Sequence, residues 1–183
     1  MGIEVRAGAP QNRRMETLWL GAWIAIRLVN AGQIPGDTLR RAEATAARIF
    51  ARAGVTVEWV DCSRRECPAI PGVWVQFLGQ KSRAAGYSVL YPSPGGTDGY
   101  AVVRYPVIAA VARDLDSDPA PLLGATIAHE IGHVLLGKAH TGSGVMMPRF
   151  NRREIQAAAR GELGFSEKEA QRLRQMLPTV AAR

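Results

Sequence analysis

The sequence has no long apolar segment and very few cysteines. Its longest strongly apolar run, Leu18–Ile26, has nine residues, whereas a helix that crosses a bilayer needs about twenty, so we expect no membrane span. Heptad and Gly-X-Y repeats are absent, and only 2 of the 183 residues are cysteines, which excludes a coiled coil, a collagen and a disulfide-dense miniprotein. Hydrophobic residues make up 47% and charged residues 21% of the chain, a balance typical of a globular protein.

Positive charge is the strongest bias of the composition. The chain has 23 basic and 16 acidic residues and a formal net charge of +7. A basic surface can bind acidic partners, but no zinc-finger pattern, RNP motif or block of lysine and arginine supports nucleic-acid binding. We therefore expect a solvated, arginine-rich surface without a nucleic-acid partner. We also expect a monomer, with residues 1–183 forming a single domain.

The two cysteines, Cys62 and Cys67, are separated by four residues. This spacing permits a small disulfide loop, two free thiols or half of a metal site, and no further cysteine is present to complete a four-cysteine site. We favour the disulfide, which indicates an oxidising compartment and therefore a secreted or extracytoplasmic protein. A clear signal peptide is not recognisable, because Glu16 interrupts the segment in which Arg13 and Arg14 precede the apolar run.

Hydrophobic periodicity predicts a strand and a helix, then several strands in succession, and then helices. Ile24, Ile26 and Leu28 recur with a period of two, which indicates a strand. Asp37 and Asp118 are placed to cap the two longest predicted helices, and a glycine follows each helix. The expected strands cover 19–30, 55–60, 73–78, 86–91 and 100–105, and the expected helices cover 38–53, 119–136, 152–160 and 167–177. This order predicts a layered domain of the α+β class, similar to α/β folds in its layers, with a small C-terminal lobe.

All three histidines fall within one short segment, His129-Glu130-Ile131-Gly132-His133-Val134-Leu135-Leu136-Gly137-Lys138-Ala139-His140. His129 and His133 are four residues apart on a predicted helix, so both imidazoles lie on one face and can reach one ion. Zn²⁺ accepts neutral imidazole nitrogen as a ligand. Glu130 can take the proton of a water molecule at that ion, which is its role in the His-Glu-x-x-His motif of metalloproteases.

A catalytic zinc site has a third protein ligand in addition to these two histidines. His140 is the first candidate, because Gly137 lets the chain leave the helix and turn back. Glu154 is a rival candidate, since a glutamate on a downstream helix is the third ligand in the thermolysin-like clan. A further interpretation is a buried helix whose histidines satisfy hydrogen bonds of the core, but it leaves Glu130 unexplained.

At this point the sequence resembles the metzincin clan of zinc metallopeptidases. The clan's signature is His-Glu-x-x-His-x-x-Gly-x-x-His, followed by a turn whose methionine lies beneath the zinc, and residues 126–148 carry the resemblance. Both Gly137 and His140 come one residue later than in the signature, and no tyrosine follows Tyr105 to steady the transition state. The resemblance implies a set of site residues: His129, His133 and His140 as ligands of one catalytic Zn²⁺, Glu130 as general base and Met146 in the turn.

The resemblance also implies a fold and a mode of substrate binding. We expect a twisted mixed sheet with the active-site helix in an upper lobe, residues 17–137, and a small helical C-terminal lobe, residues 138–183. In this clan an antiparallel edge strand pairs with an extended peptide substrate. By position, that strand comprises Gly86, Tyr87, Ser88 and Val89.

These features together predict a zinc-dependent endopeptidase. Its substrates would be peptides or proteins, hydrolysed by activated water without a covalent enzyme intermediate. Two other functions stay open. One is a zinc-bearing binding or regulatory module with little or no catalysis, and the other is a zinc hydrolase that acts on other amides or esters.

Overall fold

The computed structural model describes residues 20–63, 66–80, 84–90 and 98–181. Within them the strands are β1 (Leu20–Val29), β2 (Val55–Asp61), β3 (Val73–Leu78), β4 (Gly86–Leu90), β5 (Gly99–Arg104) and β6 (Thr179–Ala181). The helices are α1 (Gly36–Arg52), α2 (Tyr105–Asp114), α3 (Pro119–Leu136), α4 (Arg152–Ala159) and α5 (Glu167–Met176). Some positions that the predictions used lie outside the described residues: Arg13, Arg14, Glu16, Trp19 and Tyr91.

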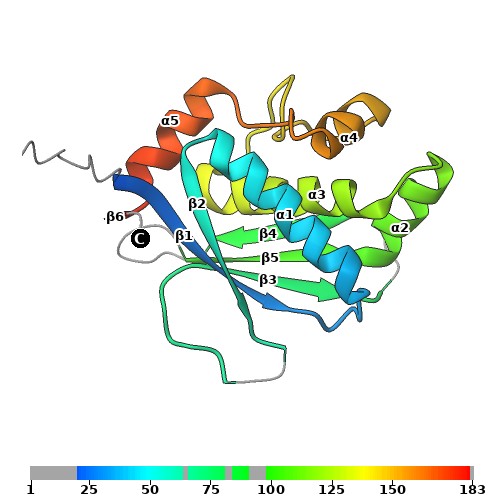
Figure 1. Ribbon diagram of the computed structural model, residues 1–183, viewed down its shortest axis with the longest axis horizontal. Helices are drawn as coiled ribbons and strands as arrows, with labels where there is room; N and C mark the ends of the chain where they lie inside the picture. Colours follow the sequence, from blue (N-terminus) through cyan, green and yellow to red (C-terminus); the bar gives the residue numbers. More distant parts are fainter. Residues whose placement is uncertain (1–19, 64–65, 81–83, 91–97, 182–183) are drawn as a thin grey trace, which may run out of the picture.

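The strands form a twisted, mixed sheet in the order β2-β1-β3-β5-β4 (Figure 1). The first four strands of this order are parallel, whereas β4 runs antiparallel to β5 and lies at the edge. The short β6 pairs antiparallel with the beginning of β1. The predicted α+β class with a mixed sheet is thus confirmed. Within the described part of the chain, one side of the β4 backbone has no neighbouring strand.

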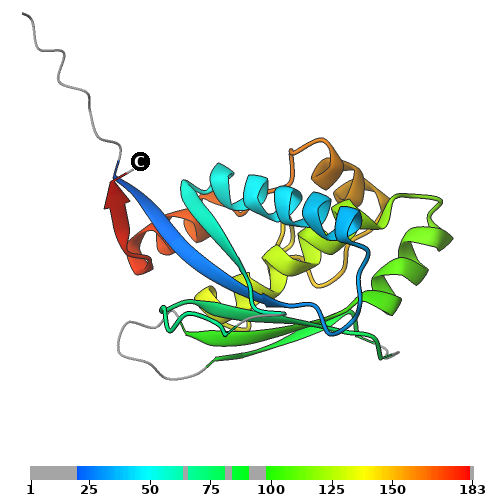
Figure 2. The ribbon, with the colours of Figure 1, turned by 60° about the horizontal axis from the view of Figure 1, so that its bottom comes forward.

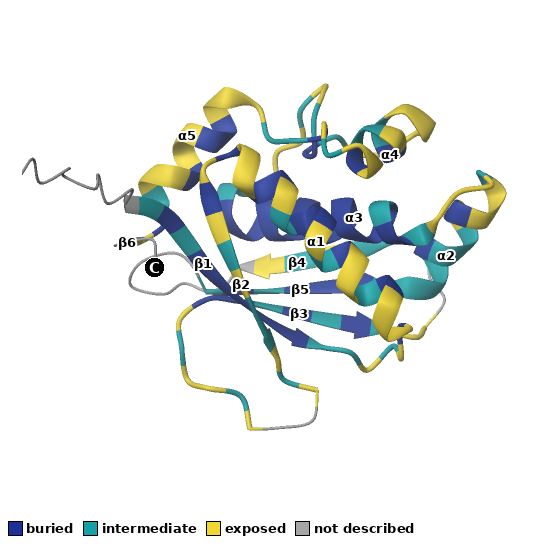
Figure 3. Cartoon of the chain, viewed as in Figure 1, coloured by how far each residue is buried: buried dark blue, intermediate teal, exposed yellow. Residues whose placement is uncertain are grey.

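The helices lie on one face of this sheet (Figure 2). Helix α1 packs against α3, and α3 packs against β4 and β5. On β1, the alternating residues Ile24, Ile26 and Leu28 are buried in the core, as the period of two predicts. Buried residues of both layers form the dark blue interior in Figure 3. Among the described residues, no helix has the length and hydropathy needed to cross a membrane.

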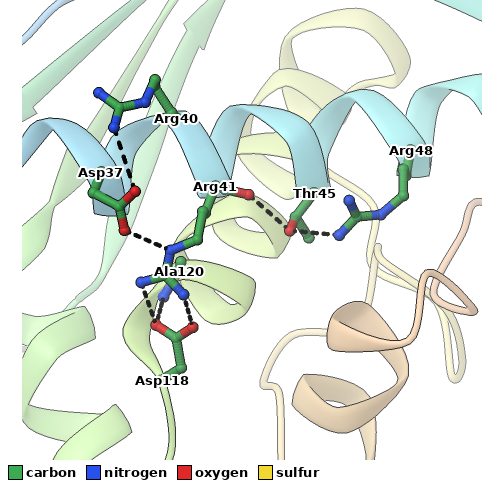
Figure 4. A network of polar contacts seen from close by, with 7 residues as sticks. All are labelled: Asp37, Arg40, Arg41, Thr45, Arg48, Asp118 and Ala120. Atoms are coloured by element: carbon green, nitrogen blue, oxygen red, sulfur yellow. Dashed lines mark hydrogen bonds and ion pairs between the residues drawn. The ribbon is translucent and has the colours of Figure 1, made fainter.

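Polar contacts join the start of α3 to α1 (Figure 4). Asp118 caps α3 by accepting a hydrogen bond from the Ala120 amide at 3.0 Å, and it also pairs with Arg41 of α1. Arg41 pairs in turn with Asp37 at 2.9 Å. The prediction that Asp37 caps α1 is wrong, because the helix begins at Gly36, two residues earlier than predicted, with Pro35 at the N-cap. Asp37 lies instead in the first turn, where a carboxylate interacts favourably with the helix dipole.

Helices α1 and α3 approach each other closely at Gly124, and replacing this glycine by alanine is expected to destabilise the protein. The added Cβ would lie 2.5 Å from the Ala42 carbonyl oxygen and 2.6 Å from the Thr45 Cβ. We expect the free energy of unfolding to fall by about 2 kcal/mol, although helix propensity alone favours alanine by about 1 kcal/mol. Chemical denaturation measures the difference, and Gly21→Ala is the control because its Cβ would have no neighbour closer than 4.0 Å. Unchanged or increased stability of Gly124→Ala would contradict the tight contact.

Two elements of the structure, α2 and β6, are missing from the predicted pattern. Helix α2 follows β5 directly, with a proline in its first turn, and its buried residues are Ile108 and Ala112. So narrow a buried stripe gives a weak helical period. Strand β6 has three residues and is held by backbone pairing with β1 and by the hydrogen bond from the Trp23 amide to the Pro178 carbonyl at 3.0 Å. The other predicted strands and helices are confirmed to within two residues at each end.

Cys62 and Cys67 form a disulfide in the connection between β2 and β3, with their Cα atoms 5.1 Å apart. The predicted pairing of the two cysteines is therefore confirmed. The residues after α3 contribute α4, α5 and β6. Because β6 joins the sheet through β1, this C-terminal segment is tied to the strand with which the described part of the chain begins.

Candidate metal centre

Helix α3 lies in the core and carries two of the three histidines. Asp118 caps its start, and Gly137 ends it with φ +97°, a left-handed value that favours glycine. Every residue from Leu122 to Leu135 is buried. Three titratable residues lie among the apolar ones, with exposed fractions of 8%, 6% and 8%: His129, Glu130 and His133. Buried polar groups of this kind need partners.

The Nε2 atoms of the three histidines converge. His133 Nε2 lies 2.9 Å from His129 Nε2 and 3.2 Å from His140 Nε2, and the three ligand atoms all lie within 4.8 Å of one another. Nitrogen ligands of a tetrahedral Zn²⁺ are about 3.3 Å apart, so these spacings suit one ion. His140 reaches the group from the loop after Gly137 and is exposed, which leaves the centre open to solvent.

Two backbone carbonyls fix the orientation of the buried rings. His129 Nδ1 donates to the Val145 carbonyl at 2.8 Å, and His133 Nδ1 donates to the Gly137 carbonyl at 3.0 Å. Because a carbonyl oxygen can only accept, Nδ1 carries the proton, and Nε2 of a neutral ring has a free lone pair. Two lone pairs that face each other at 2.9 Å repel unless a cation lies between them. The donor set therefore fits a metal ion.

Burial keeps these rings neutral. It lowers the pKa of His129 to about 4, with smaller lowering effects from His133 and His140 and an opposing effect of the hydrogen bond to Val145. Burial also lowers the pKa of His133. The neutral imidazole is the form that binds a metal ion. Burial raises the pKa of Glu130 to about 7, so its carboxyl can gain or lose a proton near neutral pH.

Two cavities meet beside Glu130, which lines both of them. The larger, of about 510 Å³, also borders His129, and α2 contributes the apolar side chains of Val107, Ile108 and Val111 to it. The smaller, of about 260 Å³, extends along β4 to His133 and His140. A ligand in either cavity can therefore reach the histidine group.

Met146, the methionine predicted to lie beneath the metal, is buried against α3. A Cβ on Gly132 of that helix would overlap the sulfur of Met146. The loop that carries Met146 is held by the hydrogen bond from the Thr141 amide to the Met146 carbonyl and by that from the Val145 amide to the Gly164 carbonyl, both 2.9 Å. Met146 thus lies next to Val145, whose carbonyl orients His129.

Phe150 and the Val145 carbonyl are site groups that sequence reasoning missed. The Phe150 ring lies edge-on to the His129 ring with a centroid distance of 5.8 Å, and it lines the larger cavity. No fixed spacing from the histidines marks this aromatic residue. A backbone carbonyl is present in every residue, so residue type gives no signal for Val145.

Glu154, the rival third ligand, caps α4. Its Oε2 accepts a hydrogen bond from the Asn151 amide at 3.1 Å, while the Asn151 side chain accepts one from the Arg153 amide at 2.8 Å. This reciprocal arrangement is a capping box. In the part of the chain that the structure describes, the group of side chains that could hold a metal ion contains His140 and not Glu154.

The predicted substrate strand corresponds to β4, which borders the smaller cavity and also has side chains exposed to solvent. Gly86, Tyr87 and Ser88 line the smaller cavity. Tyr87 and Val89 are 44% and 41% exposed, and the Arg104 guanidinium lies 4.9 Å from the centre of the Tyr87 ring. The strand therefore presents an accessible edge beside the histidine group.

Comparison with known proteins finds a similar fold and no similar sequence. No protein-family model matches the sequence, and no curated protein matches it. The crystal structure of metalloproteinase-II from Bacteroides fragilis is similar, with a TM-score of 0.55 and 12% sequence identity. The match covers 86% of this chain and 54% of that one, so this chain spans about half the length of the solved structure. At this identity the similarity concerns the fold.

Proposed function

We propose that this chain is a zinc-dependent peptidase that cleaves peptide bonds within its substrate. The observation that carries the proposal is the convergence of three imidazole Nε2 atoms, 2.9 and 3.2 Å apart about His133, next to the buried carboxyl of Glu130. Three protein ligands with one open position are typical of catalytic zinc sites. The fold shared with a metalloproteinase supports the same proposal.

Glu130 is the proposed general base. Zinc held by His129, His133 and His140 would supply a Lewis acid that polarises the peptide carbonyl and acidifies water. Glu130 accepts a proton from the attacking water and donates it to the leaving amine nitrogen. The new C–O bond forms as water adds, and the C–N bond breaks as the amine leaves. The enzyme makes no covalent bond to the substrate in these steps.

Strand β4 is the proposed binding site for the substrate backbone. Its free edge can pair with an extended peptide through main-chain hydrogen bonds, and Tyr87 and Val89 are accessible beside it. The larger cavity, with Val107 and Ile108 in its lining, has room for an apolar side chain next to the bond that is cleaved.

We further propose that the protein is of metzincin type. In support, the loop that contains Met146 follows the third histidine and is linked to His129 by the hydrogen bond to Val145. On this proposal residues 138–183 form a small C-terminal lobe of one catalytic domain. The Cys62–Cys67 disulfide supports a secreted or extracytoplasmic protein.

Digestion of unfolded casein tests the proposed function. We expect the zinc-loaded protein to cleave casein, a chelator to abolish cleavage, and added zinc to restore it. Bound zinc without cleavage of casein would favour a binding or regulatory module. If the protein cleaves small amides or esters but not casein, another type of zinc hydrolase is favoured. If it binds no zinc even when zinc is supplied in excess, the proposal is contradicted.

A further inference from the structure

Gly86 and Glu130 are the described residues that the two cavities share. The larger cavity contacts Gly86 near the start of β4, and the smaller one extends from Gly86 along the strand. Glu130 faces Gly86 from α3 at the same point. A peptide that occupies both cavities would therefore run past the point at which this glycine and this carboxyl group meet.

The space in which a side chain of residue 86 would lie is filled by Glu130. A Cβ built on Gly86 would lie 2.5 Å from Oε1, 2.8 Å from Cδ and 2.8 Å from Cγ of Glu130. All three distances are below 3.0 Å, a separation that real Cβ atoms essentially never go under. Gly86 has no positive φ, so an added side chain would not strain the backbone, and the Glu130 side chain is what would have to shift.

Neither element can easily move apart from the other. Strand β4 is held by β5, with Gly86 opposite Val103 and with the Arg104 amide donating to the Ala85 carbonyl at 2.7 Å. Val103 is fully buried, and Glu130 lies on a helix that is buried along most of its length. A methyl group added at residue 86 would therefore displace the Glu130 side chain and leave the backbone of β4 and α3 in place.

We propose that Gly86 is a positioning residue for Glu130, because the space that a side chain of residue 86 would fill is the space that the Glu130 carboxyl occupies. This inference rests on the proposed function, in which Glu130 acts on the attacking water. Gly86 itself takes no part in proton transfer. It leaves to the Glu130 carboxyl the space that this carboxyl needs in order to face the scissile bond.

A double-mutant cycle of Gly86→Ala and Glu130→Ala tests the inference. In the otherwise wild-type protein, Gly86→Ala is expected to lower kcat by about 100-fold, the cost of a misplacement of about 1 Å, with KM and zinc content little changed. In the Glu130→Ala background the overlapping atoms are gone, so Gly86→Ala should change the residual rate by less than about twofold. Gly142→Ala is the matched control, because its Cβ would meet nothing within 4 Å. A kcat of Gly86→Ala equal to that of Gly142→Ala, or an equal loss in both backgrounds, would overturn the inference.

Thermal unfolding of the same four proteins gives a readout that does not depend on catalysis. Gly86→Ala is expected to lower Tm by about 3 to 8 °C in the wild-type background and not to lower it in the Glu130→Ala background. The same Tm change in both backgrounds would also overturn the inference. If no variant cleaves peptides, the proposed function fails, while the Tm cycle still decides whether Gly86 and Glu130 compete for this space.

Discussion

Glu130→Gln is expected to lower kcat for peptide hydrolysis by about 10³-fold while the zinc content stays at the wild-type level. Glutamine has nearly the shape of glutamate, so the packing against Gly86 is kept, but an amide cannot accept the proton of the attacking water. Steady-state kinetics on a fluorogenic peptide, together with metal analysis of the same samples, measures both quantities.

Glu154→Gln is the matched control for this substitution. Glutamine also serves in a capping box, so α4 should keep its N-terminal hydrogen bonds, and we expect wild-type kinetics. Retention of more than about a tenth of the wild-type kcat by Glu130→Gln would contradict the assigned role, because removal of a general base costs at least about 100-fold.

His140→Ala is expected to weaken zinc binding by more than about 100-fold, because losing a partner of a ligand already costs about 10- to 100-fold. His140 is exposed and lies in a loop, so we expect the variant to fold normally. Competition with a chromogenic chelator measures the zinc affinity.

Glu154→Ala separates the two candidates for the third ligand. We expect it to bind zinc like the wild type and to lose about 1 kcal/mol of stability through the weakened cap of α4. Unchanged zinc affinity in His140→Ala would remove His140 from the site. Weakened affinity in Glu154→Ala would assign the third ligand to Glu154, as in the thermolysin-like alternative.

Much of the fold is predictable because its main elements are locally encoded. Strand β1 places Ile24 and Ile26 in the core cluster, as their spacing of two predicts, and α3 combines a capping aspartate, Asp118, with a terminal glycine, Gly137. Helix α2 and strand β6 are less predictable, since α2 buries a narrow stripe and β6 is held by its backbone contacts with β1. Asp37 shows a further limit, because an aspartate near a helix start can serve as a cap or as a charge in the first turn.

The candidate site is also predictable from the sequence only in part. The histidines are predictable because helical geometry turns their spacing in sequence into a shared face. The carbonyls that orient His129 and His133 belong to Val145 and Gly137. Every residue has a backbone carbonyl, so the residue type does not indicate these contacts. The sequence predicts Gly86 as part of an edge strand, but its packing against Glu130 depends on how closely β4 approaches α3, which no local pattern encodes.

Val145 links the candidate metal centre to the C-terminal segment of the described chain. Its carbonyl accepts a hydrogen bond from His129 Nδ1, and its amide donates one to the Gly164 carbonyl, shortly before α5 and β6. Strand β6 is in turn paired with β1. Local unfolding of the C-terminal segment would therefore release Val145 and leave the His129 ring free to rotate. The orientation in which the His129 ring can bind a metal ion therefore depends on a cooperative folding unit that includes the C-terminal strand, and not on α3 alone.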